Sequence, residues 1–225
     1  GIWILFYNRH LFYVHRRDFW LFIGSGMIGM TALSVFYNIS VTKGSLALSA
    51  VLLAMSPVFV LFLAAVFFHE PVTRHKLICV TLALIGCVLV SGVLESNGLS
   101  WSITGILCGI LASFFYAVYG IISKKVTQKG YHFLTITFYG TLFSGMTMLP
   151  FSNIHSLSSM IVSGQRTTFF ILIIHALVSS VLPYALYSLS MRYMEAGKAS
   201  ILASSEPAAA MLFGAVLYAE TPGIL

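Results

Sequence analysis

Long apolar stretches separated by short polar breaks make up nearly the whole chain. A helix needs roughly 20 mostly apolar residues to cross the hydrocarbon core of a membrane. By this measure the pattern predicts seven spanning helices, whose ends are defined to within a few residues. Their ranges are 19–38, 44–68, 75–94, 101–124, 132–151, 168–192 and 197–219. Residues 1–8, GIWILFYN, have the composition of the end of an eighth span.

The overall composition fits a protein whose solvent is the bilayer. Apolar residues make up 59% of the chain and charged residues 8%, with a mean hydropathy of +0.96. In soluble domains the charged fraction is about a quarter. We therefore expect an all-α, polytopic helix bundle in the cell membrane.

Basic residues are distributed unevenly between the two sides of the membrane that these helices define. If residues 9–18 face the cytoplasm, ten of the twelve lysines and arginines lie on that side, and only Lys43 and Arg166 lie on the other. This is the positive-inside pattern of membrane proteins. It explains the net charge of +6 by topology and contact with membrane lipids, so nucleic acid is not an expected partner. The predicted cytoplasmic loops are 9–18, 69–76, 124–131 and 192–198.

The sequence contains none of the short motifs that carry catalytic or cofactor chemistry. Cys79, Cys87 and Cys108 lie within predicted helices without the spacing of a metal site, so we expect buried free thiols. No nucleophile motif, HExxH sequence or glycine-rich phosphate loop is present. We therefore expect no metal, no cofactor and no enzymatic activity.

An internal repeat is visible at an offset of 150 residues. The segment 37–70 aligns without a gap on 187–220, with seven identities in 34 columns. The identical pairs include Tyr37 with Tyr187, Pro57 with Pro207 and Glu70 with Glu220. Proline, glutamate and tyrosine are scarce in such apolar segments. Matches between these residues are therefore stronger evidence for a repeat than the number of identities alone.

The offset predicts two halves, 1–94 and 101–225. Each complete half would contain five helices, ten in the full protein, so we expect this chain to lack helices at both ends. An odd number of helices inverts the second half in the membrane. Inverted repeats are typical of secondary transporters, with the substrate site between the halves near mid-membrane.

Two stretches carry a resemblance to a known family. The pattern SPVFVLFLAAVFFHEPVTRHKLICVTLALIGCVLVSG at 56–92, echoed by EPAAAMLFGAVLYAETP at 206–222, resembles the EamA-type repeat of the drug/metabolite transporter superfamily. Residues 105–126 are similar to the first helix of such a repeat, and residues 186–202 to its third-to-fourth helix junction. The resemblance implies a transporter of small metabolites such as amino acids, or an exporter of drugs, here truncated at both ends.

Glu206 is a carboxylate inside the apolar stretch 197–219. Such a group costs several kcal/mol in a spanning helix unless it faces protein or water. Pro207 lacks an N–H and frees a backbone carbonyl near Ala203, and Pro57 is expected to shape its own helix. The pair predicts a polar notch that could take a proton, bind an amine or hydrogen-bond a substrate. The alternative is a structural Glu206, hydrogen-bonded to a neighbouring helix.

Further candidates for this space lie on helix 168–192. His175, Ser179 and Tyr187 share one broad face at steps of three or four residues. Histidine can exchange protons near neutral pH, but it can equally hydrogen-bond within the bundle. Tyr187 and its repeat counterpart Tyr37 lie near helix ends, where they are either interfacial belt residues or substrate and gating contacts.

Two other positions have open alternatives. Tyr116 interrupts a stripe of small residues on helix 101–124, which suits close helix packing but also leaves the ring available for a cavity wall. Glu70 closes a helix before a proline, so solvent exposure or pairing with Arg74 or Lys76 is the simplest expectation.

These features predict a secondary transporter that moves a small organic metabolite, such as an amino acid, by alternating access. Proton coupling, facilitated diffusion and exchange all fit the sequence, and transport could run as efflux. Two functions of other classes remain open: a non-transporting membrane scaffold, and an intramembrane enzyme assembled from scattered polar residues on the same helices.

Overall fold

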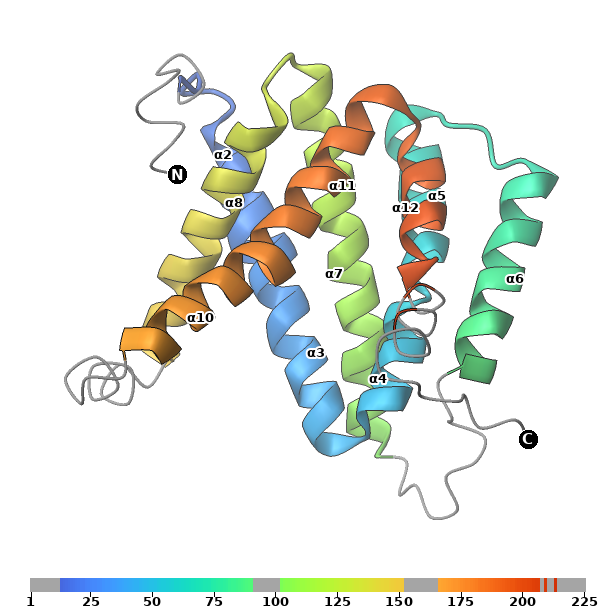
Figure 1. Cartoon of the computed structure of the whole chain (residues 1–225). Helices are drawn as coiled ribbons and strands as arrows, with labels where there is room; N and C mark the ends of the chain where they lie inside the picture. Colours follow the sequence, from blue (N-terminus) through green and yellow to red (C-terminus); the bar gives the residue numbers. More distant parts are fainter. Residues whose placement is uncertain (1–12, 91–101, 152–165, 207–208, 210–212, 214–225) are drawn as a thin grey trace. The chain divides into compact units, whose positions relative to one another are not determined.

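The computed structural model describes residues 13–90, 102–151, 166–206, 209 and 213, and these residues form helices and turns without a strand. The all-α prediction is therefore confirmed. The segments in chain order are α2 (Phe19–Ile23), η2 (Gly24–Thr31), α3 (Ala32–Lys43), α4 (Leu46–Leu53), α5 (Ser56–Phe68), α6 (Arg74–Val90), α7 (Ile103–Gln128), α8 (Phe133–Met148), η3 (Leu149–Phe151), α10 (Arg166–Ala176), η4 (Leu177–Val181), α11 (Leu182–Tyr193) and α12 (Ala196–Ala203) (Figure 1).

Several of these segments join into longer helices that can cross a membrane. Within the described residues, four helices are long and apolar enough to do so. They are Phe19–Lys43, Leu46–Phe68, Ile103–Gln128 and Thr167–Tyr193. The protein is thus a multi-pass integral membrane protein, as its composition predicts.

Some helix boundaries differ from those predicted. α7 continues to Gln128, so Lys124 and Lys125 lie in its last turns and not in a loop. Basic side chains are favourable near a helix C-terminus, which explains why the charge does not end the helix. Within the predicted helix 197–219, α12 ends at Ala203, a turn follows at 204–205, and the described residues Glu206, Ala209 and Phe213 are again helical. Residues 1–8, 91–94 and most of 207–219 lie outside the described part of the chain.

The helix Leu46–Phe68 is broken near its middle. α4 ends at Leu53, Ala54 and Met55 form a turn, and α5 begins with Pro57 in its first turn. Because Pro57 has no N–H, it cannot donate to the carbonyl of Leu53 four residues earlier. The break therefore lies where the proline chemistry requires it.

The backbone repeats its local structure at the same offset of 150 residues as the sequence. The turn at 54–55 recurs at 204–205, and the break at 44–45 recurs at 194–195. The π-helical segments end at Thr31 and at Val181. Equivalent positions in the two halves thus have equivalent backbone irregularities.

The chain divides into two compact units. The first unit contains Gly1–Thr31 and Ile122–Tyr193, and the second contains Ala32–Ile121 and Met194–Leu225. Each unit therefore combines segments from both predicted halves of the sequence, and two long helices are shared between the units.

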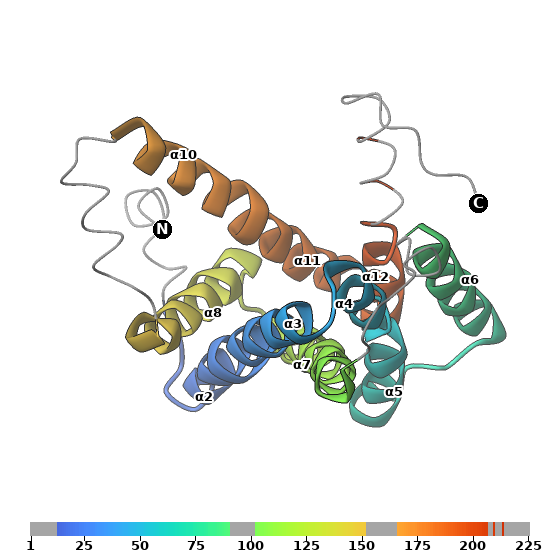
Figure 2. The same ribbon diagram turned by 90° about the horizontal axis from the view of Figure 1, so that it is seen from below.

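The first unit is packed around α8. Its buried core comprises Phe22, Val126 and Ile136, and α2 and α8 lie alongside each other (Figure 2). A Cβ on Gly26 would lie 2.6 Å from the carbonyl oxygen of Gly140, so the glycine permits close approach of these helices. Thr31 Oγ1 donates to Ser144 Oγ at 3.1 Å across the same contact.

The second unit is packed against the first half of α7. A Cβ on Gly105 would lie 3.2 Å from the Gly44 nitrogen, and one on Gly109 would lie 2.9 Å from Leu52 Cβ. The predicted stripe of small residues on this helix therefore does serve close packing. α12 contacts both α5 and α6, and Phe36 stacks on Phe115 with ring centroids 5.5 Å apart.

Candidate functional site

The second unit contains a cavity of about 250 Å³ beside its two helix breaks. Its lining residues come from α3, from α4 and the break after it, from α7, and from α12 and the turn that follows it. They are Tyr37, Ala50, Leu53, Ala54, Ser56, Tyr116, Ser200, Ala203, Ser204 and Glu206.

The cavity walls have an internal symmetry that follows from the sequence repeat. Eight of the ten lining residues form four pairs separated by 150 positions. The pairs are Ala50 with Ser200, Leu53 with Ala203, Ala54 with Ser204, and Ser56 with Glu206. The two breaks therefore face one space with equivalent positions, but the second half supplies the more polar wall.

Hydrogen bonds along α12 determine which donor and acceptor groups this polar wall presents to a ligand. Ser200 Oγ donates to the Gly197 carbonyl, and Ser204 Oγ donates to the Ser200 carbonyl, both at 3.0 Å. Since each hydroxyl has one proton and two lone pairs, these oxygens remain acceptors. Glu206, which is exposed, adds a carboxylate. The wall is thus rich in hydrogen-bond acceptors and negative in charge.

The opposite wall is held in place by neighbouring helices. Ser113 on α7 donates to the Leu52 carbonyl at the end of α4, and this carbonyl also accepts the backbone N–H of Met55 in the turn at 3.1 Å. Ser40 and Ser49 share a buried hydrogen bond of 2.8 Å. These contacts join α4 to α3 and α7 on the N-terminal side of the break at Ala54 and Met55.

Three of the predicted site residues lie together in this cavity. Glu206 follows the second break, Tyr37 comes from α3, and Tyr116 comes from α7. For Tyr116 the sequence allows either helix packing or a place in a cavity wall. In the structure Tyr116 lines the cavity. Pro57 is buried next to the lining residue Ser56, whereas Pro207 lies outside the described residues.

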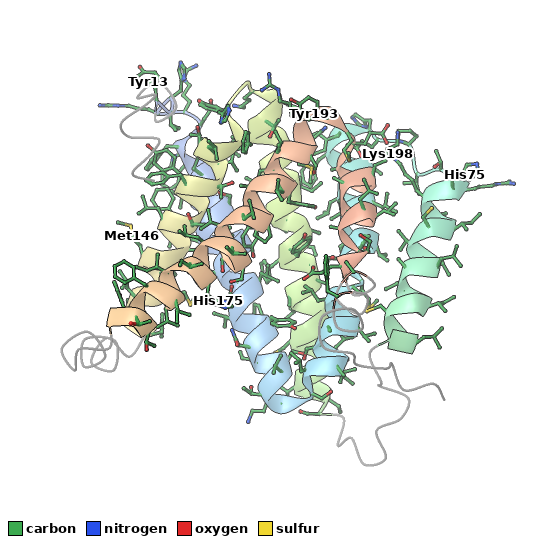
Figure 3. The ribbon with its side chains drawn as sticks, viewed as in Figure 1. Tyr13, His75, Met146, His175, Tyr193 and Lys198 are labelled. Carbon is green, nitrogen blue, oxygen red and sulfur yellow. The ribbon has the colours of Figure 1, made fainter. Side chains whose placement is uncertain are left out.

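The other three predicted residues lie in the first unit and differ in exposure. His175 on α10 (Figure 3) and Ser179 are exposed, whereas Tyr187 is buried. The π-helical segment η4 lies between His175 and Tyr187, and its wider i→i+5 turn departs from the regular α-helical spacing on which the prediction of one face rests. Ser179 Oγ donates to the His175 carbonyl at 2.7 Å.

Sequence reasoning missed Ser200 and Ser204. The signal that could have found them is the repeat itself, because their counterparts Ala50 and Ala54 flank the break set by Pro57. Projecting the first break onto the second half marks both serines as cavity residues.

Glu70 has a different role from the one expected. Its carboxylate does not pair with Arg74 or Lys76 but accepts the backbone N–H groups of Ala196 at 2.9 Å and Gly197 at 3.2 Å. The first N–H groups of a helix have no intrahelical partner, and the helix dipole favours a negative charge there. Glu70 therefore anchors the start of α12, the helix that leads to the cavity.

The cysteines also differ in part from expectation. Cys87 and Cys108 are buried free thiols, but Cys79 on α6 is exposed. α6 places much of its apolar surface outside the unit, which suits contact with lipid tails. Among the residues described by the structure, no group of three His, Cys, Asp or Glu side chains could hold a metal ion.

Proteins with sequences similar to this chain are named as uncharacterized transporters. The sequence profile of the EamA-like transporter family matches residues 1–92 and 103–225. An uncharacterized transporter of Archaeoglobus fulgidus is 25% identical over 197 residues, covering 87% of this chain and 67% of that protein. A second one from the same organism is 29% identical over 185 residues, covering 82% and 63%. The uncharacterized transporter YdfC of Bacillus subtilis is 22% identical over 202 residues, covering 89% and 64%.

The fold is shared with a solved protein as well. A crystal structure superposes on 99% of this chain and 75% of its own with a TM-score of 0.75 at 12% identity, which shows a common fold. The chain spans about two thirds of the length of the curated relatives it matches. With the family profile matched on both sides of residue 100 and relatives named as transporters, this chain belongs to the EamA-like transporter family.

Proposed function

We propose that this protein is a secondary transporter that carries a small, amine-bearing organic metabolite across the cell membrane by alternating access. The observation that carries the proposal is the cavity whose walls are repeat-related positions at two helix breaks. Broken helices in inverted repeats form the substrate sites of many secondary transporters near the bilayer midplane. The repeats 1–94 and 101–225 supply one break each.

The chemistry of the lining supports a ligand that donates hydrogen bonds. Glu206 provides a carboxylate, and the Ser200 and Ser204 hydroxyls present acceptor lone pairs because their protons bond to the helix. A protonated amine satisfies such a set through charge-assisted hydrogen bonds. The rings of Tyr37 and Tyr116 add faces that attract a cation.

Glu206 also suits proton coupling. A carboxylate that is reached in turn from the two sides of the membrane can hold a proton in one state and a cationic substrate in the other. Competition between proton and substrate for the same oxygens then links the two fluxes. If Glu206 binds substrate but no transported proton, transport is facilitated diffusion or exchange. Measuring proton movement distinguishes these two modes from proton-coupled transport.

Contacts within each unit support the proposed orientation. In the first unit Asp18 pairs with Lys129, and in the second Lys76 pairs with Glu195. Loops predicted to be cytoplasmic therefore meet at one end of each unit. We place on the cytoplasmic side the loops 9–18, 69–76, 192–198 and the part of 124–131 that follows α7.

The test is transport by the full-length protein in proteoliposomes that contain a pH-sensitive dye. A pool of amines, amino acids and small carboxylates is added outside, with wild type beside Glu206→Gln. We expect substrate-dependent proton movement in wild type and a loss of about tenfold or more in the variant, since a charge-assisted contact contributes about 1.5–3 kcal/mol. Ser205→Ala, next to Glu206 but absent from the lining, is the matched control.

The cavity symmetry offers a rescue experiment. Glu206→Ser should be inactive, and adding Ser56→Glu at the equivalent position should restore part of the activity by returning the carboxylate to the same space. Equal proton-coupled transport by wild type and a folded Glu206→Gln variant would contradict the proposal. Chemical turnover of a pool compound without movement across the membrane would identify an enzyme instead.

A further inference from the structure

The first unit contains a second cavity, of about 360 Å³, at the end where its predicted cytoplasmic loops meet. It is formed by the segment before α2, the α7–α8 turn and the last turn of α11. The lining residues are Tyr13, Thr127, Gly130, Tyr131, His132, Thr135 and Arg192. Figure 3 shows Tyr13 and Tyr193, which follows Arg192, toward this end of the unit.

The cavity has a positive lining. Arg192 and His132 supply basic groups, and none of the lining residues is acidic. Asp18, the acid that contacts this region, is already paired with Lys129, and it accepts the Tyr131 hydroxyl proton at 2.8 Å. The hydrogen bond from Lys129, followed by that from Tyr131, holds the pKa of Asp18 below its usual value. The negative charge of Asp18 is therefore neutralised by Lys129, which is not a lining residue of the cavity.

The two basic groups are arranged as donors. His132 Nδ1 accepts the backbone N–H of Leu134 at 3.3 Å, so the neutral ring carries its proton on Nε2. Arg192 forms no ion pair with any residue that the structure describes, and its planar guanidinium can bind two oxygens at once. Both groups can therefore donate to the same oxyanion.

We propose that this cavity binds the phosphate group of an anionic ligand, with Arg192 and His132 as its principal donors. A volume of about 360 Å³ falls within the range of small-molecule sites, about 300–1,000 Å³. Phosphate oxygens prefer the planar fork of arginine, reinforced by further charge-assisted hydrogen bonds. The ligand is the headgroup of an acidic phospholipid or a free phosphate, and the cytoplasmic leaflet is rich in acidic lipids.

The electrostatics of His132 make binding depend on pH. Burial, and then the nearby Arg192 charge, lower the pKa of His132. A bound anion offsets the Arg192 charge and favours protonation of His132, whose Nδ1 then releases the Leu134 N–H, so affinity should increase as the pH falls. Other titratable groups at this end of the unit include Tyr13, Tyr131, His15, Asp18, Lys129 and Lys124, whose Nζ donates to the Met191 carbonyl at 2.8 Å.

The test follows thermal unfolding of the full-length protein in a neutral detergent. Three ligands are titrated at matched ionic strength: phosphatidylglycerol, phosphatidylcholine and inorganic phosphate. We expect phosphatidylglycerol or inorganic phosphate to raise Tm more than phosphatidylcholine does. Arg192→Gln should weaken the apparent affinity by about tenfold or more, the effect of losing one charge-assisted contact. Arg74→Gln, an exposed charge on α6 outside the cavity, is the matched control.

The outcomes separate the two ligand sources. Stabilisation by both inorganic phosphate and phosphatidylglycerol identifies a site for the bare phosphate group, whereas stabilisation by phosphatidylglycerol alone identifies a lipid site. The proposal is overturned if neither ligand stabilises the protein, or if Arg192→Gln and Arg74→Gln respond alike. Each variant is compared with its own unliganded Tm, so a general loss of stability does not imitate loss of binding.

Discussion

At the scale of single residues, one carboxylate is shared by two lysines in very different surroundings. Lys76 is 6% exposed, and its Nζ lies 2.6 Å from Glu195 Oε2 and 2.9 Å from the Pro71 carbonyl. Lys198 is 59% exposed and lies 3.5 Å from the other oxygen. A buried charge that loses its partner stays desolvated, whereas an exposed charge is hydrated by water.

We therefore predict that Glu195→Gln lowers the free energy of unfolding by about 1–3 kcal/mol, the cost of an uncompensated buried polar group. Lys198→Gln, which removes only the exposed member, should change stability by less than about 1 kcal/mol. Denaturant or thermal unfolding in detergent measures both. Equal effects of the two substitutions would show that burial of Lys76 does not decide the energy of this network.

The same pair predicts a pH dependence. The hydrogen bond from Lys76, more than any other contact, lowers the pKa of Glu195. A lowered folded-state pKa contributes stability above the unfolded-state pKa, and this contribution is lost as the pH falls through the folded value. The difference in Tm between wild type and Glu195→Gln should thus narrow on acidification. A difference that stays constant from neutral to acidic pH would contradict this assignment.

At the scale of elements, glycines allow helices to approach where larger residues would not fit. Gly26 in η2 packs against α8, where an added Cβ would lie 2.6 Å from Gly140 O and 2.7 Å from Phe143 Cβ. Gly86 in α6 has no atom within 4 Å of such a Cβ. The two positions differ in packing although both are glycines within apolar helices.

We predict that Gly26→Ala destabilises the protein by about 1–3 kcal/mol, the usual cost of overpacking. Gly86→Ala should be neutral or stabilise it by about 0.4–1 kcal/mol, because alanine restricts the unfolded chain. Thermal unfolding of both variants in the same detergent tests the pair. If Gly26→Ala were as stable as wild type, the helices would have room to separate at this contact.

At the scale of the whole molecule, the alternation of spans assigns each loop to one side of the membrane. Lys43 ends α3, and Lys125 lies in the last turn of α7. Both side chains are exposed. The positive-inside pattern predicts that the first lies on the outer side and the second on the cytoplasmic side.

We predict opposite accessibility for cysteines introduced at these positions in a protein without its native cysteines. A membrane-impermeant maleimide should label Lys43→Cys in intact cells and Lys125→Cys only in inverted vesicles. Labelling of both from the same side would show that the span count between them is wrong.

The sequence identified much of the fold but only part of the candidate site. Glu206, Tyr37 and Tyr116 stand out as polar residues in apolar helices, and all three line one cavity. His175 and Ser179 stand out by the same criterion but lie exposed in the first unit. Polarity within a span indicates that a residue needs an explanation, but it does not specify which neighbours will surround it.

The sequence by itself determined the membrane location, the helices and the repeat, because apolar length, proline chemistry and charge distribution act locally along the chain. Only the tertiary structure decided which segments pack together. It placed the two helix breaks around one cavity, used Glu70 to cap α12 and left His175 exposed in the first unit. Such contacts join residues far apart in sequence, so their geometry depends on packing that no local pattern encodes.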